Sequence, residues 1–136
     1  MKKSSIIRTI AIIAGIYIIG QGICREFFSQ RIKNLDDLQR ILKEEAMNIG
    51  RIKESKDIYC FFGKSPWGTA ASGKIRKGQY LLILDKDRSR TAVRHELYHI
   101  FRGHCDKAYE VGEWTTFDKI KNEITARLYA DYGLRL

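Results

Sequence analysis

Hydrophobic and polar positions change their period several times along the chain. Residues 31–50 carry hydrophobic side chains three or four positions apart, a pattern that predicts an amphipathic helix ending at Gly50. Residues 57–63 and 79–85, DIYCFFG and QYLLILD, are short runs of aromatic and aliphatic residues, which are typical of strands. The glycine-rich and serine-rich stretch between them predicts a loop, with at most a short strand at residues 69–71.

The helical period returns in the second half of the chain. Residues 86–103 predict a helix that ends near Gly103, and residues 115–133 predict another helix that ends near Gly133. One helix, a small sheet and two further helices make an α+β domain, which we place at residues 30–136.

An uncharged run of sixteen residues, Thr9–Cys24, sets the N-terminal segment, residues 1–29, apart from this domain. The run is apolar on every side, so the sequence predicts a transmembrane-like helix that acts as a single membrane anchor. Sixteen helical residues span roughly 24 Å against a hydrocarbon core of about 30 Å, a gap that a snorkelling Arg8 could narrow. The two alternatives are a cleaved signal peptide and an ordinary buried helix.

Composition and charge limit which partners are expected and whether disulfide bonds are expected. The chain has 136 residues, enough for one domain of ordinary size, and a formal net charge of +9. Its charges are scattered, and no DNA-reading motif or basic run with interleaved aromatic residues is present in the sequence, so a direct nucleic-acid partner is not expected. Cys24, Cys60 and Cys105 form no CxxC pair and do not indicate a disulfide scaffold.

The motif with clear chemical content is HELYH at residues 95–99. His95 and His99 stand one helical turn and about 40° apart, so both imidazoles project from one face and could bind one zinc ion. Glu96 could then take a proton from a metal-activated water and return it to a leaving amine. The alternative is a surface helix that carries scattered histidines.

Two histidines and a water leave one tetrahedral position for a third protein ligand. His104 misses the metzincin spacing by one residue and would face away from His95 in a continuous helix, so we interpret it as a helix-end residue. Glu123 is the better candidate, because small residues follow it at helical spacing and would let its helix approach closely. The alternative for Glu123 is an exposed ion pair with Arg127, one turn later.

These segments together resemble a known family. HELYHIFRGH at residues 95–104, followed by EITARLYADYGL at residues 123–134, is similar to the zinc metallopeptidase domain of the ImmA/IrrE family. The matching features are HExxH, a Gly-His pair and a glutamate that begins an ExxA helix, and the resemblance covers roughly residues 35–134. It implies a small zincin-like domain with three zinc ligands and one general base: His95, His99 and Glu123 as ligands, and Glu96 as the base.

Three positions depart from the pattern of that family. Tyr98 replaces the usual glycine between the glutamate and the second histidine, which predicts different packing around the site. Thr125 and Arg127 replace an acidic residue and an asparagine that are common in the glutamate helix of the family, and these changes predict different contacts around the ligands.

We therefore expect a zinc-dependent endopeptidase that cleaves a protein or peptide substrate, for example a regulator. The alternative is a catalytically silent zinc-binding module that senses or tethers a partner at the membrane; only turnover would need Glu96. Lys2, Lys3 and Arg8 would keep the amino end in the cytoplasm and place the domain outside a spanned membrane. The cations after the apolar run, and a family that usually works in the cytosol, favour the cytoplasmic side instead.

Overall fold

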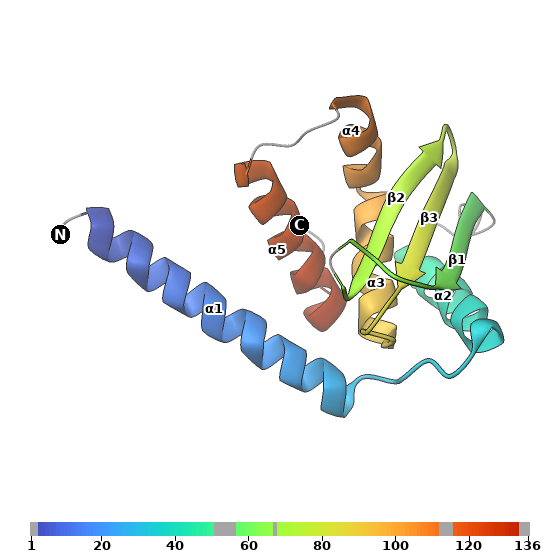
Figure 1. Cartoon of the computed structure of the whole chain (residues 1–136), viewed down its shortest axis with the longest axis horizontal. Coiled ribbons are helices and arrows are strands. Elements are labelled where there is room, and N and C mark those ends of the chain that lie inside the picture. Colours follow the sequence, from blue (N-terminus) through green and yellow to red (C-terminus); the bar gives the residue numbers. More distant parts are fainter. Residues whose placement is uncertain (1–2, 51–56, 67, 112–115, 134–136) are drawn as a thin grey trace.

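The computed structural model describes residues 3–50, 57–66, 68–111 and 116–133, and the described chain has the α+β architecture predicted from the sequence. It contains five helices and one three-stranded sheet (Figure 1). In chain order the elements are α1 (Lys3–Phe28), α2 (Leu35–Ile49), β1 (Ile58–Phe62), β2 (Ala70–Arg76), β3 (Gln79–Leu84), α3 (Arg90–Phe101), α4 (His104–Val111) and α5 (Thr116–Tyr132).

The sheet has β3 at its centre, paired in parallel with β1 and antiparallel with β2. The β2–β3 pair places Ser72 opposite Leu82 and turns through Gly78, whose φ of +74° suits a residue without a Cβ. Strand β2 is longer than the short strand predicted at residues 69–71. Its sequence, AASGKIR, is rich in small and charged residues, and pairing with the hydrophobic β3 compensates for this weak strand propensity.

Helix α3 lies against the sheet and forms the centre of the domain (Figure 1). It packs on β2 and β3, and it also contacts α2, α4 and α5. The main core consists mostly of aliphatic side chains of α2, α3 and the sheet, because α2 and α3 turn apolar faces inward. Its largest fully buried members are Leu38, Ile41, Leu82, Leu84, Val93 and Leu97.

Capping residues fix where α2 and α3 begin. The Asn34 side chain accepts a hydrogen bond from the Asp37 backbone N–H at 2.9 Å, and the Ser89 hydroxyl accepts one from the Ala92 backbone N–H at 3.1 Å. Helix α3 therefore begins at residue 90, later than the predicted helix at residues 86–103.

Glu45 of α2 is buried where α2 packs against α3. Its side chain is 1% exposed, and it accepts hydrogen bonds from Arg90 Nε at 2.5 Å and from Arg94 Nε at 2.9 Å. Arg94 also donates to the Ala130 carbonyl of α5 at 3.0 Å. Burial raises the pKa of Glu45, but the two guanidinium groups more than offset this and hold that pKa below its ordinary value. Through Arg94, these contacts connect α2, α3 and α5 and help to fix α5 relative to α3.

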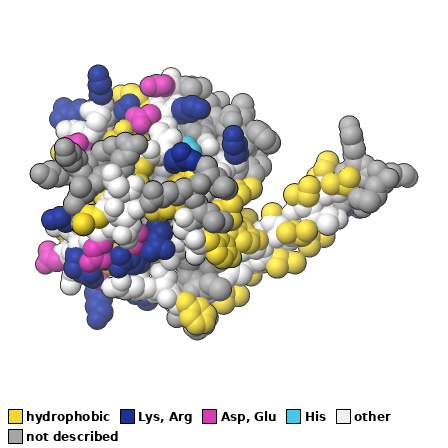
Figure 2. Space-filling model, turned by 180° about the vertical axis from the view of Figure 1, so that it is seen from behind, with side chains coloured by type: hydrophobic (Ala, Val, Ile, Leu, Met, Phe, Trp, Pro, Cys, Tyr) yellow, Lys and Arg dark blue, Asp and Glu magenta, His cyan; other side chains and the backbone are white. Residues whose placement is uncertain are grey.

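The N-terminal helix corrects one prediction. Helix α1 projects from the domain (Figure 1), and hydrophobic side chains lie along its surface (Figure 2). Its isoleucines are exposed, for example Ile6 at 41% and Ile16 at 66%. Among the described residues, no helix combines the length and the apolar character needed to cross a membrane. The predicted transmembrane-like helix and single membrane anchor are therefore wrong. The prediction of the side of the membrane on which the domain lies depended on that anchor and falls with it. The uncharged run is short, and glycine, glutamine and tyrosine residues interrupt its aliphatic sequence.

Candidate metal centre

Helix α3 presents its two histidines together because its apolar residues occupy another face. Val93, Leu97 and Ile100 are buried in the core. His95 and His99 project from successive turns, with their ring centroids 4.9 Å apart and their Nε2 atoms 3.2 Å apart. This is the one-face arrangement predicted from their spacing.

Helix α5 approaches α3 closely where its side chains are small. Ala126 and Ala130 are almost completely buried, at 0% and 1% exposure. Between them on the helix, Tyr129 stacks on Tyr98 of α3, with ring centroids 5.0 Å apart and an interplanar angle of 26°. This packing brings Glu123, at the preceding turn of α5, over the two histidines.

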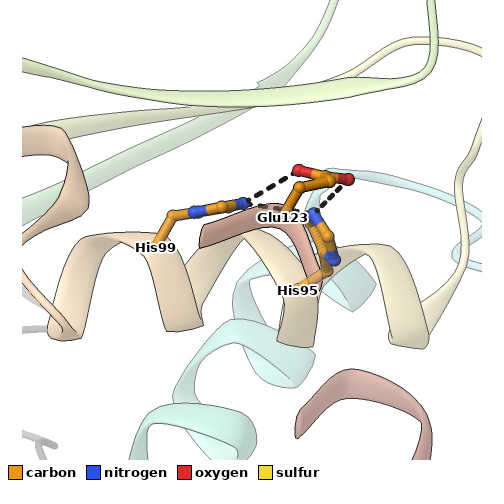
Figure 3. Close-up of side chains that lie close together, drawn as sticks. All are labelled: His95, His99 and Glu123. Carbon is orange, nitrogen blue, oxygen red and sulfur yellow. Dashed lines mark hydrogen bonds and ion pairs between the residues drawn. The ribbon is translucent and has the colours of Figure 1, made fainter. Parts of the chain in front are cut away.

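The three side chains converge on one point (Figure 3). Glu123 Oε1 lies 3.3 Å from His95 Nε2, and Glu123 Oε2 lies 3.4 Å from His99 Nε2. Bonds of about 2.0 to 2.1 Å at tetrahedral angles would separate neighbouring ligand atoms by about 3.3 Å. The two Nε2 atoms are separated by nearly this distance, and a different oxygen of Glu123 lies near each of them. The group of His95, His99 and Glu123 could therefore hold one metal ion.

Glu123 is suited by charge as well as by position. Burial raises the pKa of its carboxyl, but the hydrogen bonds and charges of His95 and His99 more than offset this and hold that pKa well below its ordinary value. Glu123 is therefore a carboxylate at neutral pH, the form that binds a cation. Arg127 Nε also donates to Glu123 Oε1 at 2.9 Å, so the ion pair considered from the sequence coexists with the approach to the histidines.

The predicted general base is held by a residue from the sheet. Glu96 is 7% exposed, and its Oε2 accepts a hydrogen bond from the Ser72 hydroxyl of β2 at 2.5 Å. The Cys105 thiol lies 3.7 Å from the same Ser72 oxygen, as a donor. Burial raises the pKa of Cys105 to about 12, so this cysteine is a neutral thiol at neutral pH.

His104 lies beside the three-residue group but outside it. Gly103 has a φ of +74° and reverses the chain between α3 and α4, so that His104 begins a new helix. The His104 Nδ1 atom is 2.9 Å from His99 Nδ1, the nitrogen that points away from Glu123. Burial, with the neighbouring His99, lowers the pKa of His104 to about 4. It is therefore neutral at neutral pH.

The three departures from the family pattern each have a local explanation. Tyr98 packs its ring against Tyr129 and against the edge of His104. The Thr125 hydroxyl donates to the Asn122 carbonyl of its own helix, at 3.0 Å. Arg127 binds the candidate ligand Glu123 directly.

One residue of the candidate site, Ser72, could not be found from the sequence. Ser72 is one of two serines in a stretch that predicts mostly loop, and no motif marks it. Its contact with Glu96 depends on the pairing of β2 with β3 and on the packing of α3 against β2. By contrast, the structure brings His95, His99 and Glu123 together as the sequence predicts.

No protein-family model, curated protein or solved structure matches the chain. The resemblance to the ImmA/IrrE family therefore depends on the sequence motifs alone.

If the three side chains form one metal site, removing the carboxylate should empty it. We expect the full-length protein to retain about one zinc per chain after dialysis, and Glu123→Ala to retain far less, because only two protein ligands remain. Elemental analysis by mass spectrometry measures this ratio. Glu110→Ala removes an exposed carboxylate of α4 and should leave the zinc content unchanged. Undiminished zinc in Glu123→Ala would assign the third position to another residue.

Proposed function

We propose that this chain is a zinc-dependent endopeptidase of the ImmA/IrrE type that hydrolyses a peptide bond with a metal-activated water. The observation that carries the proposal is the convergence of His95, His99 and Glu123: the two Nε2 atoms lie 3.2 Å apart, and each has one oxygen of Glu123 within 3.4 Å. The buried carboxylate of Glu96 is next to His95 in the sequence. Two imidazoles and one carboxylate leave a position for water, which is the ligand set of hydrolytic zinc sites. The HExxH sequence and the motif resemblance support the same class.

The roles of the residues follow from their chemistry. Bound zinc would polarise a water molecule and lower its pKa toward about 7. Glu96 would accept a proton from the attacking water and deliver it to the leaving amine. Ser72 donates to Glu96 Oε2, which fixes the carboxylate and leaves Oε1 to accept the proton. His95, His99 and Glu123 keep their places because α5 packs closely on α3.

The sheet offers a way to bind an extended peptide. Within the described part of the chain β2 pairs with β3 alone, so β2 is an edge strand. An edge strand can add a peptide as a further strand through backbone hydrogen bonds, which are independent of the peptide's sequence. Ser72 lies on this strand and contacts Glu96, so a peptide bound along β2 would pass near the proposed base. This supports a protein or peptide as the substrate class.

Mapping of newly formed protein termini tests the proposal. The full-length chain and its Glu96→Gln variant are co-expressed with candidate partner proteins, and cleaved termini are identified by mass spectrometry. We expect termini that depend on the wild-type chain and are absent with Glu96→Gln. Identical termini in both samples across a broad panel would instead support a catalytically silent zinc-binding module.

A further inference from the structure

His104 is placed by the break between two helices. Helix α3 ends at Phe101, and Gly103 takes a positive φ that L side chains rarely adopt. In a continuous helix, His104 would lie about 140° from His99 around the axis. The reversal at Gly103 instead brings the two Nδ1 atoms to 2.9 Å, a hydrogen-bond distance.

The two ring nitrogens of His99 therefore face different partners. Its Nε2 atom points to Glu123 Oε2 at 3.4 Å and to His95 Nε2 at 3.2 Å, which is the proposed metal position. Its Nδ1 atom faces His104. A neutral imidazole that binds a metal through Nε2 carries its proton on Nδ1, so His99 would donate that proton to the lone pair of His104 Nδ1.

The aromatic ring of Tyr98 packs against His104 in this position. The ring of Tyr98 meets that of His104 edge to face, with centroids 6.0 Å apart and an interplanar angle of 72°. Tyr98 is itself stacked on Tyr129 of α5. His104 is thus packed against a tyrosine of α3 that itself stacks on α5.

The other histidine of the site lacks a comparable contact. His95 Nδ1 is buried, and the described residues offer it no hydrogen-bond partner. In the described structure, only His99 of the two candidate histidine ligands is therefore oriented by a contact of its Nδ1 atom. The removal of the His104 acceptor should for this reason have a measurable effect on the metal site.

We propose that His104 is a positioning residue for the metal centre: its Nδ1 accepts a hydrogen bond from His99 Nδ1 and so fixes the ring orientation and the tautomer with which His99 binds the metal through Nε2. This inference rests on the metal centre of the proposed function, but it does not require peptidase activity. Partners of this kind orient ligands, and their loss commonly costs about 10-fold to 100-fold in metal affinity.

Two substitutions separate the hydrogen bond from the packing. His104→Phe keeps a ring against Tyr98 but removes the acceptor. His104→Asn keeps an acceptor oxygen close to the position of Nδ1. We expect His104→Phe to weaken zinc binding by the full-length chain by about 10-fold to 100-fold and His104→Asn to restore most of the loss, measured by competition with a chromophoric chelator.

The same experiment can reject the inference separately from the proposed function. Wild-type zinc affinity in His104→Phe would overturn the positioning role and leave the metal centre intact. Equal weakening in both variants would assign His104 to packing or to direct ligation. A wild-type chain that binds no zinc would overturn both proposals. As a second readout, long-range proton–nitrogen NMR spectra of the zinc-loaded wild-type chain should show His99 protonated at Nδ1, and protonation at Nε2 would contradict the inference.

Discussion

Replacement of Glu96 by glutamine is expected to lower the peptidase rate by about 10² to 10⁴, while zinc binding and the fold remain unchanged. Glutamine has nearly the same shape and can still contact the Ser72 hydroxyl, which lies 2.5 Å from the carboxylate in the wild-type chain. Its amide cannot accept the proton of the attacking water, however, and general acid–base catalysis commonly contributes a factor of this size. The rate is measured with a library of quenched fluorescent peptides and zinc-loaded protein.

The control for this substitution is another buried glutamate away from the site. Glu45→Gln makes the same chemical change at a glutamate that pairs with Arg90 and Arg94. Any loss of rate in Glu45→Gln would come from unfolding of the protein, so it should disappear at temperatures below the melting temperature of this variant. Zinc content is measured for both variants. Equal rates for the wild-type chain and Glu96→Gln would remove Glu96 from the role of base.

The second large effect concerns stability. Substitution of Glu45 by alanine is expected to lower the free energy of unfolding by about 3 kcal/mol, because two guanidinium groups lose the buried carboxylate between them. This is the lower end of the usual range of about 3 to 5 kcal/mol, since Arg90 keeps its ion pair with Glu44 at 2.9 Å. Urea denaturation measures the change.

Glu44→Ala provides a matched control in the adjacent position. Glu44 is 40% exposed and pairs with Arg40 and Arg90, so its loss should cost less than about 1 kcal/mol. The dependence of the free energy of unfolding on acidic pH gives a second check. The pKa of Glu45 lies below its unfolded value of 4.5, so its contribution is complete above that pH and is lost as the pH falls through the folded pKa. Glu45→Ala should weaken this acid dependence, and similar costs for both variants would contradict the ion-pair account.

Local patterns predicted the parts of the fold that have clear periods. The apolar spacing in residues 31–50 and 115–133 corresponds to α2 and α5, and the hydrophobic runs at residues 57–63 and 79–85 correspond to β1 and β3. These segments could be predicted because their hydrophobic residues recur with the period of a helix or lie in a short continuous run. In α5 the buried face is nevertheless formed by Ala126, Tyr129 and Ala130, while Ile124 and Tyr132 are exposed. The spacing of the HExxH motif likewise predicted that the two imidazoles project from one face of a helix.

The remaining features depend on contacts that are distant in the sequence. Strand β2 forms because β3 pairs with it, although its own residues are weak strand formers. Helix α4 follows the reversal at Gly103, and neither this short helix nor the contact of His104 with His99 has a periodic signal. The Ser72 contact with Glu96 joins a strand to a helix. The apolar run of α1 has a clear pattern, but the pattern alone overstated its ability to cross a membrane.

In the proposed centre, His95, His99 and Glu123 together bind one metal ion that leaves a position open for water. X-ray absorption at the zinc edge of the zinc-loaded full-length chain tests it most directly. We predict about four nitrogen and oxygen ligands at about 2.0 to 2.1 Å, with outer-shell scattering from two imidazoles and no sulfur. A sulfur ligand at about 2.3 Å, or the absence of imidazole scattering, would contradict the proposed centre.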